Sequence, residues 1–376
     1  MKLLTSRQKC VIIDLEPRAK DDVCASIAPN IGGFMNIKDI ARLAGTSPTT
    51  VSRILNDDPR VSAQTRENVL RVIEQTQYKP SSLGRNLRSH SSKKLLMMLP
   101  TIQNPFYHDI FFSFEEYARL HGYSVLIAVT NRNPDIERLY FDVLFTRQVD
   151  GVACFLPTIP FDEIRNIASE YPFVACCWRG FSEMNINYVC IDNANATYDA
   201  MQYLIKLGHR RIAALNGNFA GRMYEVERAN GYRRALEAAG IPYNADLDVI
   251  CDYNHEAAYE ATRKLMSLKK PPTAIMALSD ERAAGAIKYL VKHGIRPGVD
   301  VDVVGYDNVP VSEIVTPSLT TIAQPRLAIG REAAQILLSR IEDPTVPNKG
   351  VILSHQLIIR ESTRKPGDPI KELNAK

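Results

Sequence analysis

The chain has 376 residues, of which 45% are apolar and 23% charged, the composition of an ordinary globular protein. This length predicts two or three domains rather than one small core. The longest apolar runs have the length of buried strands and fall short of the roughly 20 residues that a membrane span needs. The net charge of +4 is unevenly spread: residues 35–94 hold eleven Lys and Arg against five Asp and Glu, which points to a polyanionic partner for that segment alone.

The first 34 residues contain no apolar stretch long enough for a secretion signal, because Arg7 and Lys9 interrupt it. We therefore expect a cytoplasmic protein. The same residues show no periodicity and end in the loop-like run "APNIGGF", so residues 1–34 are predicted to be a disordered extension, with Met35 as the natural start. An arm that adds contacts to the polyanion is the alternative, and its net charge of +1 supports it little.

Seven cysteines without framework spacing fit a reducing compartment, and no Cys/His spacing predicts a zinc site. Cys154, Cys176, Cys177 and Cys190 stand in apolar, strand-like runs, so we expect buried free thiols. A redox switch at the adjacent pair Cys176–Cys177 is the weaker interpretation. No catalytic triad, phosphate-binding glycine loop or paired carboxylates can be argued from spacing, so no enzyme activity and no cofactor are predicted.

Residues 35–80 predict three helices. Apolar residues from Ile37 to Ala44 follow one helical face, and Gly45-Thr46 ends it. Ser47 is a good N-cap and Pro48 suits the first helical position, with a buried stripe at Val51, Ile54 and Leu55. Ser62 is predicted to cap a third helix. Two short helices joined by about three residues and braced by a third form a helix-turn-helix unit.

The second of these helices, "SPTTVSRILN", is rich in small hydroxyl groups. If its aliphatic residues face inward, then Thr49, Thr50, Ser52 and Arg53 face mostly outward. Small hydroxyls near a helix N-terminus allow the backbone to lie deep in the major groove of DNA and to bond base edges or phosphates. The alternative is that the hydroxyls only cap the helix or contact water. Arg60 is a further predicted DNA contact.

The stretch "IKDIARLAG…TTVSRILN…VSAQTRENVLRVIEQTQYKPSSLGRNLR" resembles the DNA-binding region of the lactose/galactose repressor (LacI/GalR) family over more than fifty residues. The resemblance implies that Pro48, Thr49, Thr50 and Arg53 lie on the recognition helix. Pro48 departs from the Ser or Thr common at that position.

Residues 81–94 contain Leu83 and Leu87 at i,i+4 spacing, with Arg85 and Arg88 beside them. A helix of about two turns is marginal in water, and Gly84 weakens it further, so we expect order only when something holds the segment. The family resemblance implies a hinge helix in the minor groove, where Leu87 wedges between base pairs and kinks the DNA. A flexible linker is the alternative.

From Leu95 onward, short apolar strands alternate with helical stretches, which predicts parallel sheets. About 280 residues of this pattern predict two doubly wound subdomains. The predicted strands are Leu95–Leu99, Ser124–Val129, Gly151–Leu156, Phe173–Cys177, Arg211–Asn216, Thr273–Leu278 and Asp302–Tyr306. The predicted helices lie near 106–121, 135–147, 161–170, 193–207, 225–239, 255–268 and 280–293.

Ligands of such folds bind beyond the carboxyl ends of the strands. The residues that follow the predicted strands are aromatic or can form paired hydrogen bonds, a combination that suits a small, neutral, hydroxyl-rich ligand. They are Phe106, Tyr107, Trp178, Arg222, Arg228, Asp280, Asp307 and Gln324. Asp192 also follows an apolar run, and we expect it to serve coupling rather than contact.

"LGHRRIA", "DERAAGA", "GYDN" and "TPSLTTIAQP" match recurring phrases of the effector-binding domain of the same family, which is similar to periplasmic sugar-binding proteins. The resemblance implies a cleft lined by Phe106, Tyr107, Trp178, Arg222, Arg228, Tyr253 and Asp307. Core packing is the alternative for Trp178 and Tyr253, and structural ion pairing for Arg228 and Asp307. The C-terminal stretch looks closest to the purine- and cytidine-repressor branch, which hints at a nucleoside, purine or ribose-like effector.

The predicted architecture is therefore an all-α helix-turn-helix head (35–80), a hinge helix and linker (81–94), an α/β effector-binding and dimerisation domain of two subdomains (95–363) and a polar tail (364–376). The predicted function is a repressor that binds a pseudopalindromic operator as a homodimer, with a sugar, nucleoside or purine effector. A solute-binding protein of a transport system shares such a body but needs an export signal and has no use for the basic head. An enzyme with a DNA-binding head is the other alternative, but it needs a catalytic constellation in the body, and none can be argued from the residue spacing.

Overall fold

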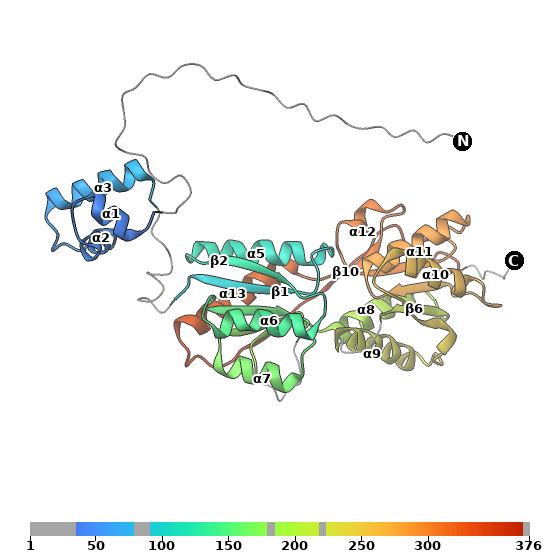
Figure 1. The fold of residues 1–376 in the computed structure, drawn as a ribbon. Helices are drawn as coiled ribbons and strands as arrows, with labels where there is room; N and C mark the ends of the chain where they lie inside the picture. Colours follow the sequence, from blue (N-terminus) through green and yellow to red (C-terminus); the bar gives the residue numbers. More distant parts are fainter. Residues whose placement is uncertain (1–34, 79–90, 179–184, 218–222, 371–376) are drawn as a thin grey trace, which may run out of the picture. The chain divides into compact units, whose positions relative to one another are not determined.

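The computed structural model describes residues 35–78, 91–178, 185–217 and 223–370. The chain divides between Arg85 and Asn86 into two compact units, called here the head and the body (Figure 1). Several predictions fall outside the described residues and stay predictions: those for the extension 1–34, for Leu87 and Arg88, and for Arg222.

The head consists of three helices, as predicted: α1 (Ile37–Leu43), α2 (Pro48–Leu55) and α3 (Ala63–Thr76). The Ser47 hydroxyl caps α2 by accepting the Thr50 amide at 3.1 Å, and the Ser62 hydroxyl caps α3 by accepting the Thr65 amide at 3.3 Å. Asn36 caps α1 in a reciprocal capping box with Asp39. Both predicted serine caps are confirmed.

The head is held together by one small hydrophobic cluster drawn from all three helices. Its centre is Ile40, Val51 and Val69, each fully buried. The spacing of these residues places one apolar stripe of each helix toward the others and leaves the remaining faces in solvent. The outer face of α2 is therefore available for contacts outside the chain.

The body contains two six-stranded sheets, and the part of the chain around each sheet is called a lobe. The N-lobe sheet has the order β11-β5-β4-β3-β1-β2 and is parallel in its recorded pairings. Its strands are β1 (Lys94–Leu99), β2 (Ser124–Val129), β3 (Gly151–Phe155), β4 (Phe173–Cys176), β5 (Tyr188–Ile191) and β11 (Gly350–Leu353).

The C-lobe sheet has the corresponding order β12-β10-β9-β8-β6-β7, with β12 antiparallel to β10. Its strands are β6 (Ile212–Asn216), β7 (Asp248–Ile250), β8 (Ala274–Ala277), β9 (Asp302–Asp307), β10 (Thr320–Ala323) and β12 (Gln356–Ile358). The prediction of two parallel-sheet subdomains is confirmed. Strands β5, β7, β10, β11 and β12 were not among the predicted strands.

Helices cover the sheets of both lobes (Figure 1). Those of the N-lobe are α5 (Phe106–Leu120), α6 (Pro134–Phe145), α7 (Phe161–Glu170) and α13 (Arg326–Glu342). Those of the C-lobe are α8 (Asn193–Lys206), α9 (Met223–Ala238), α10 (His255–Met266), α11 (Asp280–Lys292) and the short α12 (Val311–Ile314). All seven predicted helices are present, and α12 and α13 are additions.

The chain passes between the lobes at three places: from β5 to α8, from β10 to α13, and from β11 to β12. Each lobe is therefore built from separate stretches of sequence, and α13 packs against the N-lobe although it follows a C-lobe strand. Three crossings bring the strand ends of both lobes to one junction, which positions the site described below.

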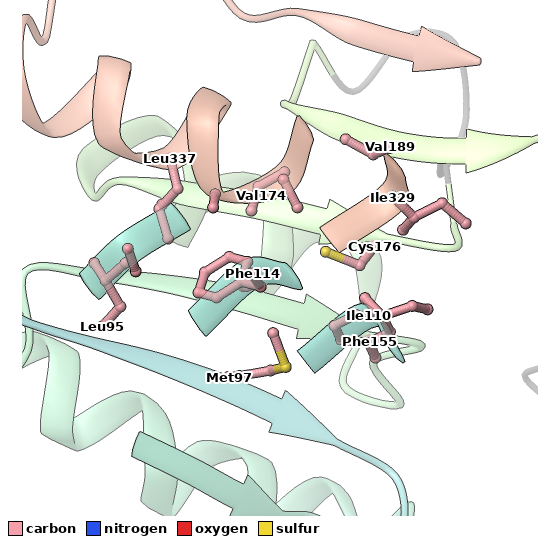
Figure 2. Close-up of a cluster of buried hydrophobic side chains, with 14 of the residues drawn as sticks. Leu95, Met97, Ile110, Phe114, Phe155, Val174, Cys176, Val189, Ile329 and Leu337 are labelled. Atoms are coloured by element: carbon pink, nitrogen blue, oxygen red, sulfur yellow. The ribbon is translucent and has the colours of Figure 1, made fainter. Parts of the chain in front are cut away.

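The N-lobe core lies between the sheet and the helices α5 and α13. Figure 2 shows Ile110 and Phe114 of α5 and Leu337 of α13 directed toward strand residues such as Met97 and Val174. The two helices approach closely at Gly330, where an added Cβ would lie 2.1 Å from the Ile110 carbonyl oxygen. Only glycine permits this approach, so α5 and α13 are tightly joined.

Candidate functional site

The outer face of α2 presents four of the predicted DNA-contact residues. Thr49 and Arg53 are exposed, and Thr50 is half-buried, with its hydroxyl 2.8 Å from that of the capping Ser47. Pro48 is exposed at the first helical position, where no amide donor is needed. This face therefore offers hydroxyls and one guanidinium at a helix N-terminus.

Ser52 does not face outward, contrary to the sequence-based expectation. Its exposed fraction is 8%, and its backbone carbonyl accepts the Asn56 side-chain amide at 2.8 Å. The residue stands next to Val51 in the chain, and both are buried along with Ile54. A direct DNA contact from Ser52 is therefore not available in this conformation.

Arg60 is exposed in the loop after α2 and is paired with Asp58. Its Nη2 lies 2.7 Å from Asp58 Oδ2 and its Nε lies 3.0 Å from Oδ1. The hydrogen bonds from Arg60 hold the pKa of the Asp58 carboxyl well below its ordinary value. Arg60 can contact a phosphate only by exchanging or sharing this partner.

A cavity of about 460 Å³ opens between the two lobes of the body, within the range of small-molecule sites. The N-lobe and the crossing at β5 contribute Thr101, Gln103, Asn104, Pro105, Phe106, Tyr107, Arg132, Leu156, Cys177 and Ile191. The C-lobe and its crossings contribute Asn193, Tyr224, Arg228, Tyr253, Asn254, His255, Glu256, Glu281, Asp307 and Gln324. Many of these residues end a strand or follow one, as expected for parallel sheets.

A polar network from the C-lobe forms one wall of the cavity. Arg228 donates through Nε to Asn193 Oδ1 (3.1 Å), through Nη1 to the Leu278 carbonyl (2.8 Å) and through Nη2 to Asp307 Oδ1 (3.4 Å). Gln324 Nε2 donates to the same Asp307 oxygen at 2.7 Å. Four buried side chains from separate elements are thereby fixed in place before any ligand arrives.

Burial sets the electrostatics of this wall. It raises the pKa of the Asp307 carboxyl, and the Arg228 charge and the Gln324 hydrogen bond partly offset that rise. Burial lowers the pKa of the Arg228 guanidinium, but neighbouring groups led by Tyr306 and Asp307 more than offset this, and the net pKa is raised. The guanidinium lies 3.6 Å from the centre of the Tyr306 ring. The wall therefore holds a buried Arg–Asp pair.

Aromatic rings from the N-lobe form the opposing wall. The rings of Phe106 and Tyr107 meet edge to face at 5.4 Å, and Tyr107 meets Phe155 in the same way at 5.5 Å. Burial raises the pKa of the Tyr107 phenol well above its ordinary value, so Tyr107 is a neutral hydroxyl group at neutral pH. Tyr253 adds a ring from the C-lobe side.

Two of the predicted effector residues lie outside the cavity lining. Trp178 is buried and stacks on Phe161 with ring centres 5.7 Å apart, so it serves core packing. Asp280 is fully buried; its carboxylate accepts the Val309 amide at 2.8 Å and the Thr321 hydroxyl at 2.5 Å. Burial raises its pKa well above the ordinary value. Asp280 supports the chain that follows Asp307.

Asp192 also stays outside the lining and caps α8 by accepting the Asn195 amide at 2.9 Å. The structure brings six other predicted residues together around the cavity: Phe106, Tyr107, Arg228, Tyr253, Asp307 and Gln324.

Sequence reasoning missed several lining residues. Arg132 follows β2, and its Nη2 donates to the Tyr224 hydroxyl of α9 at 3.2 Å, which links the two lobes. Asn193 follows β5 by two positions. Arg132, Asn193 and Glu281 could have been found by applying the strand-end rule to every strand, whereas Tyr224 lies on α9 and carries no such signal.

The cysteines Cys154, Cys176 and Cys190 are buried, as predicted, while Cys177 is half-buried in the cavity lining. Burial raises the pKa of the Cys177 thiol far above its ordinary value, so it is a thiol rather than a thiolate at neutral pH. Within the described ranges, no group of three or more His, Cys, Asp or Glu is placed to hold a metal ion. None of the helices described is long and apolar enough to cross a bilayer.

Two family models match the chain. Residues 36–81 match the model described as bacterial regulatory proteins of the lacI family. Residues 92–361 match the model described as periplasmic binding proteins and sugar binding domain of the LacI family. Together the two matches cover the head and nearly all of the body.

Individual proteins agree with the family models. The HTH-type transcriptional repressor CytR of Escherichia coli K12 is 34% identical over 328 residues, which is 87% of this chain and 96% of the relative. A transcriptional regulator CelR–cellobiose complex is 30% identical with a TM-score of 0.65, covering 87% of this chain and 99% of the other. The lac repressor dimer bound to operator and the anti-inducer ONPF has a TM-score of 0.78 at 24% identity, covering 88% and 99%, and shows likeness of fold.

Proposed function

The chain belongs to the LacI family of bacterial regulatory proteins, and from this premise we propose that a small, neutral, hydroxyl-rich effector in the body cavity controls how a dimer of the protein binds its operator. The protein is a ligand-responsive, DNA-binding transcriptional regulator, and its relatives are transcriptional regulators rather than enzymes. We propose three further points: the chemical class of the effector, the dimer, and the roles of individual residues.

The effector proposal rests on one observation: the cavity has a polar wall from the C-lobe and an aromatic wall from the N-lobe. Arg228 and Asp307 form a paired donor and acceptor that suits neighbouring ring hydroxyls, and Gln324 fixes the carboxylate that would accept from them. Phe106 and Tyr107 offer rings on which a sugar or base face can pack. A sugar, a nucleoside or a purine fits this chemistry, and the 30%-identical CelR complex contains cellobiose.

The head supports the DNA part of the proposal. Thr49, Thr50 and Arg53 lie on the accessible part of the second helix of a helix-turn-helix unit, which is the helix that enters the major groove in that motif. The eleven basic residues of segment 35–94 supply the charge that binding to phosphates requires. We assign direct contacts to Thr49, Thr50 and Arg53, and backbone contact to Pro48 and Arg60.

An exposed apolar surface on the N-lobe supports the dimer. Ile102, Phe112 and Ile127 are 58%, 64% and 44% exposed, and they border a groove of about 370 Å³ on α5 and the edge strand β2. Large exposed apolar residues gathered on one surface mark an interface. A second copy of the chain is the proposed occupant, because a pseudopalindromic operator requires two heads related by a twofold axis.

The sequence supplies the proposed connection between cavity and operator. Residues 81–94 form a segment too short to be stable as an isolated helix, and we assign Leu87 the minor-groove wedge with Arg88 beside it. An effector that favours one arrangement of the two lobes would then favour or oppose ordering of the paired hinge segments on DNA. The coupling is reciprocal: operator and effector change each other's affinity by the same factor.

One experiment tests the proposal in two steps. The full-length protein is screened by thermal shift against ribose, cellobiose, cytidine, adenosine, hypoxanthine and guanine, and bound duplexes are selected from a random pool. We expect at least one compound to raise the melting temperature and an inverted repeat to emerge, with affinity that falls steeply with salt. No preference for any inverted repeat, with or without these compounds, would contradict the proposal and favour a solute-binding protein.

A further inference from the structure

Arg326, the first residue of α13, lies at the crossing where the chain returns from the C-lobe to the N-lobe. It is not part of the cavity lining. Its guanidinium nevertheless contacts both lobes. Nε and Nη2 donate to Asp109 Oδ2 of α5 at 2.9 and 2.7 Å, and Nη1 donates to the carbonyl oxygens of Asp307 and Asn308, both at 2.6 Å.

The two carbonyls belong to a strained turn. Asp307 has a φ of +110° and Asn308 a φ of +53°, in a region that side-chain-bearing residues rarely adopt, so surrounding contacts must hold them there. On the C-lobe side, Arg360 Nη2 donates to Asn308 Oδ1 at 2.9 Å, and Asp280 accepts the Val309 amide. The hydrogen bonds from Arg326 restrain the same turn from the N-lobe side.

The other partner of Arg326 belongs to the helix that carries the aromatic wall. Asp109 lies three residues after Phe106 and two after Tyr107, and Phe112 of the exposed apolar groove follows on the same helix. Helix α5 is fixed against α13 by the close approach at Gly330. A movement of α5 would therefore displace the aromatic wall, the carboxylate that Arg326 binds, and the apolar groove together.

We propose that Arg326 is a positioning residue of the effector site, which fixes the spacing between the Asp307 wall and the aromatic wall and couples a change in that spacing to α5. A guanidinium suits this role because its donors are fixed in one plane, so one side chain can serve a carboxylate and two carbonyls at once. A lysine side chain ends in a single ammonium group, which cannot bind the Asp109 carboxylate and both carbonyl oxygens at once. The inference rests on the proposed function only where it calls the cavity an effector site.

Hydrogen exchange of the full-length protein without any ligand tests the proposal. In Arg326→Gln, the segments 105–112 and 304–310 are both expected to exchange at least about tenfold faster, because both sets of bonds are lost. In Asp109→Ala, the acceptor for Nε and Nη2 is lost but the bonds to the two carbonyls remain, so only segment 105–112 is expected to exchange faster. Arg138→Gln is the matched control, since Arg138 pairs with Glu163 on the N-lobe surface at 2.9 Å and lies outside the cavity lining.

Three results would overturn the inference: unchanged exchange of segment 304–310 in Arg326→Gln, an increase spread evenly over both lobes, or the same response in Arg138→Gln. If Arg326→Gln fails to fold, Arg326→Lys replaces it, with an intermediate increase expected in both segments. Full protection in the lysine variant would show that the planar guanidinium is not required. Because no effector is used, these results are independent of whether any compound in the screen binds.

Discussion

The head and the body place their candidate functional groups in opposite ways. The head buries one small cluster and offers its polar residues on the outside of α2, whereas the body encloses its Arg–Asp pair between two lobes. Their charges differ as well, since residues 1–85 carry a net charge of +4 and residues 86–376 a net charge of zero. In the proposed function a large, charged polymer binds at an exposed face and a small neutral molecule in an enclosed one, so substitutions in the two units should separate the two activities.

The largest expected separation comes from the cavity. Arg228→Ala and Asp307→Ala should abolish the response to effector, because each removes one half of a buried pair and leaves the other half uncompensated. Operator affinity measured without effector should stay within about threefold of the unaltered protein, since effector and operator are coupled only when both are present. A gel shift with and without the compound found in the screen measures both quantities.

Asp307→Asn is the matched variant for that prediction, because it keeps the side-chain shape while removing the charge. Effector affinity is expected to fall about 100-fold, which corresponds to about 2.7 kcal/mol. An effector response that survives in all three variants would place the effector site elsewhere in the body.

The opposite pattern is expected for a substitution in the head, with operator affinity reduced and effector binding retained. Arg53→Ala should weaken operator binding by about 1–3 kcal/mol and leave the thermal shift caused by the effector unchanged, because Arg53 is exposed on α2. Arg42→Ala is the control, since Arg42 is also exposed, on α1, and its Nη2 lies 3.2 Å from Asp39 Oδ1. Equal losses in the two variants would show general charge attraction rather than a contact of the recognition helix.

The segment between the two units should behave like the head in this comparison. Leu87→Ala is expected to weaken operator binding about tenfold while effector affinity stays nearly intact, because the wedge acts only on DNA. Titrations of each ligand against the same variant provide the test. Equal loss of both affinities would refute the hinge assignment.

The smallest effect is expected at a helix cap. Ser47→Ala removes the acceptor of the Thr50 amide and should destabilise the head by about 1 kcal/mol, with hydrogen exchange faster in residues 37–76 alone. Faster exchange in the body as well would show that the stability of the body depends on the head.

The sequence predicted the head almost completely, because short helices with serine caps and one apolar stripe each are specified by local signals. It also predicted seven strands of the body, because their apolar runs are continuous. The strands β7 and β12 escaped prediction because three residues carry no periodicity of their own and form only by pairing with a neighbour. Helix α13 was missed although its apolar content is high.

Site residues could be predicted where their position at a strand end determines whether they line the cavity. They could not be predicted where the direction of the side chain determines it. Asp307 was found because residues at the carboxyl ends of parallel strands meet at one edge of the sheet. Trp178 also follows a strand, but its ring turns into the core against Phe161, and the Asp280 carboxylate turns toward Val309. Ser52 was assigned outward by helical periodicity, which does not resolve a short side chain at the margin of the stripe. Such outcomes depend on tertiary packing.

The most direct test of the central claim is the affinity of the full-length protein for its selected inverted repeat, measured with and without a compound that raises its melting temperature. We predict a change of at least about fivefold in operator affinity, and the same factor when the compound is titrated with and without operator. A compound that binds in the cavity yet leaves operator affinity unchanged, in a protein with intact head and body, would contradict the claim that the cavity governs DNA binding.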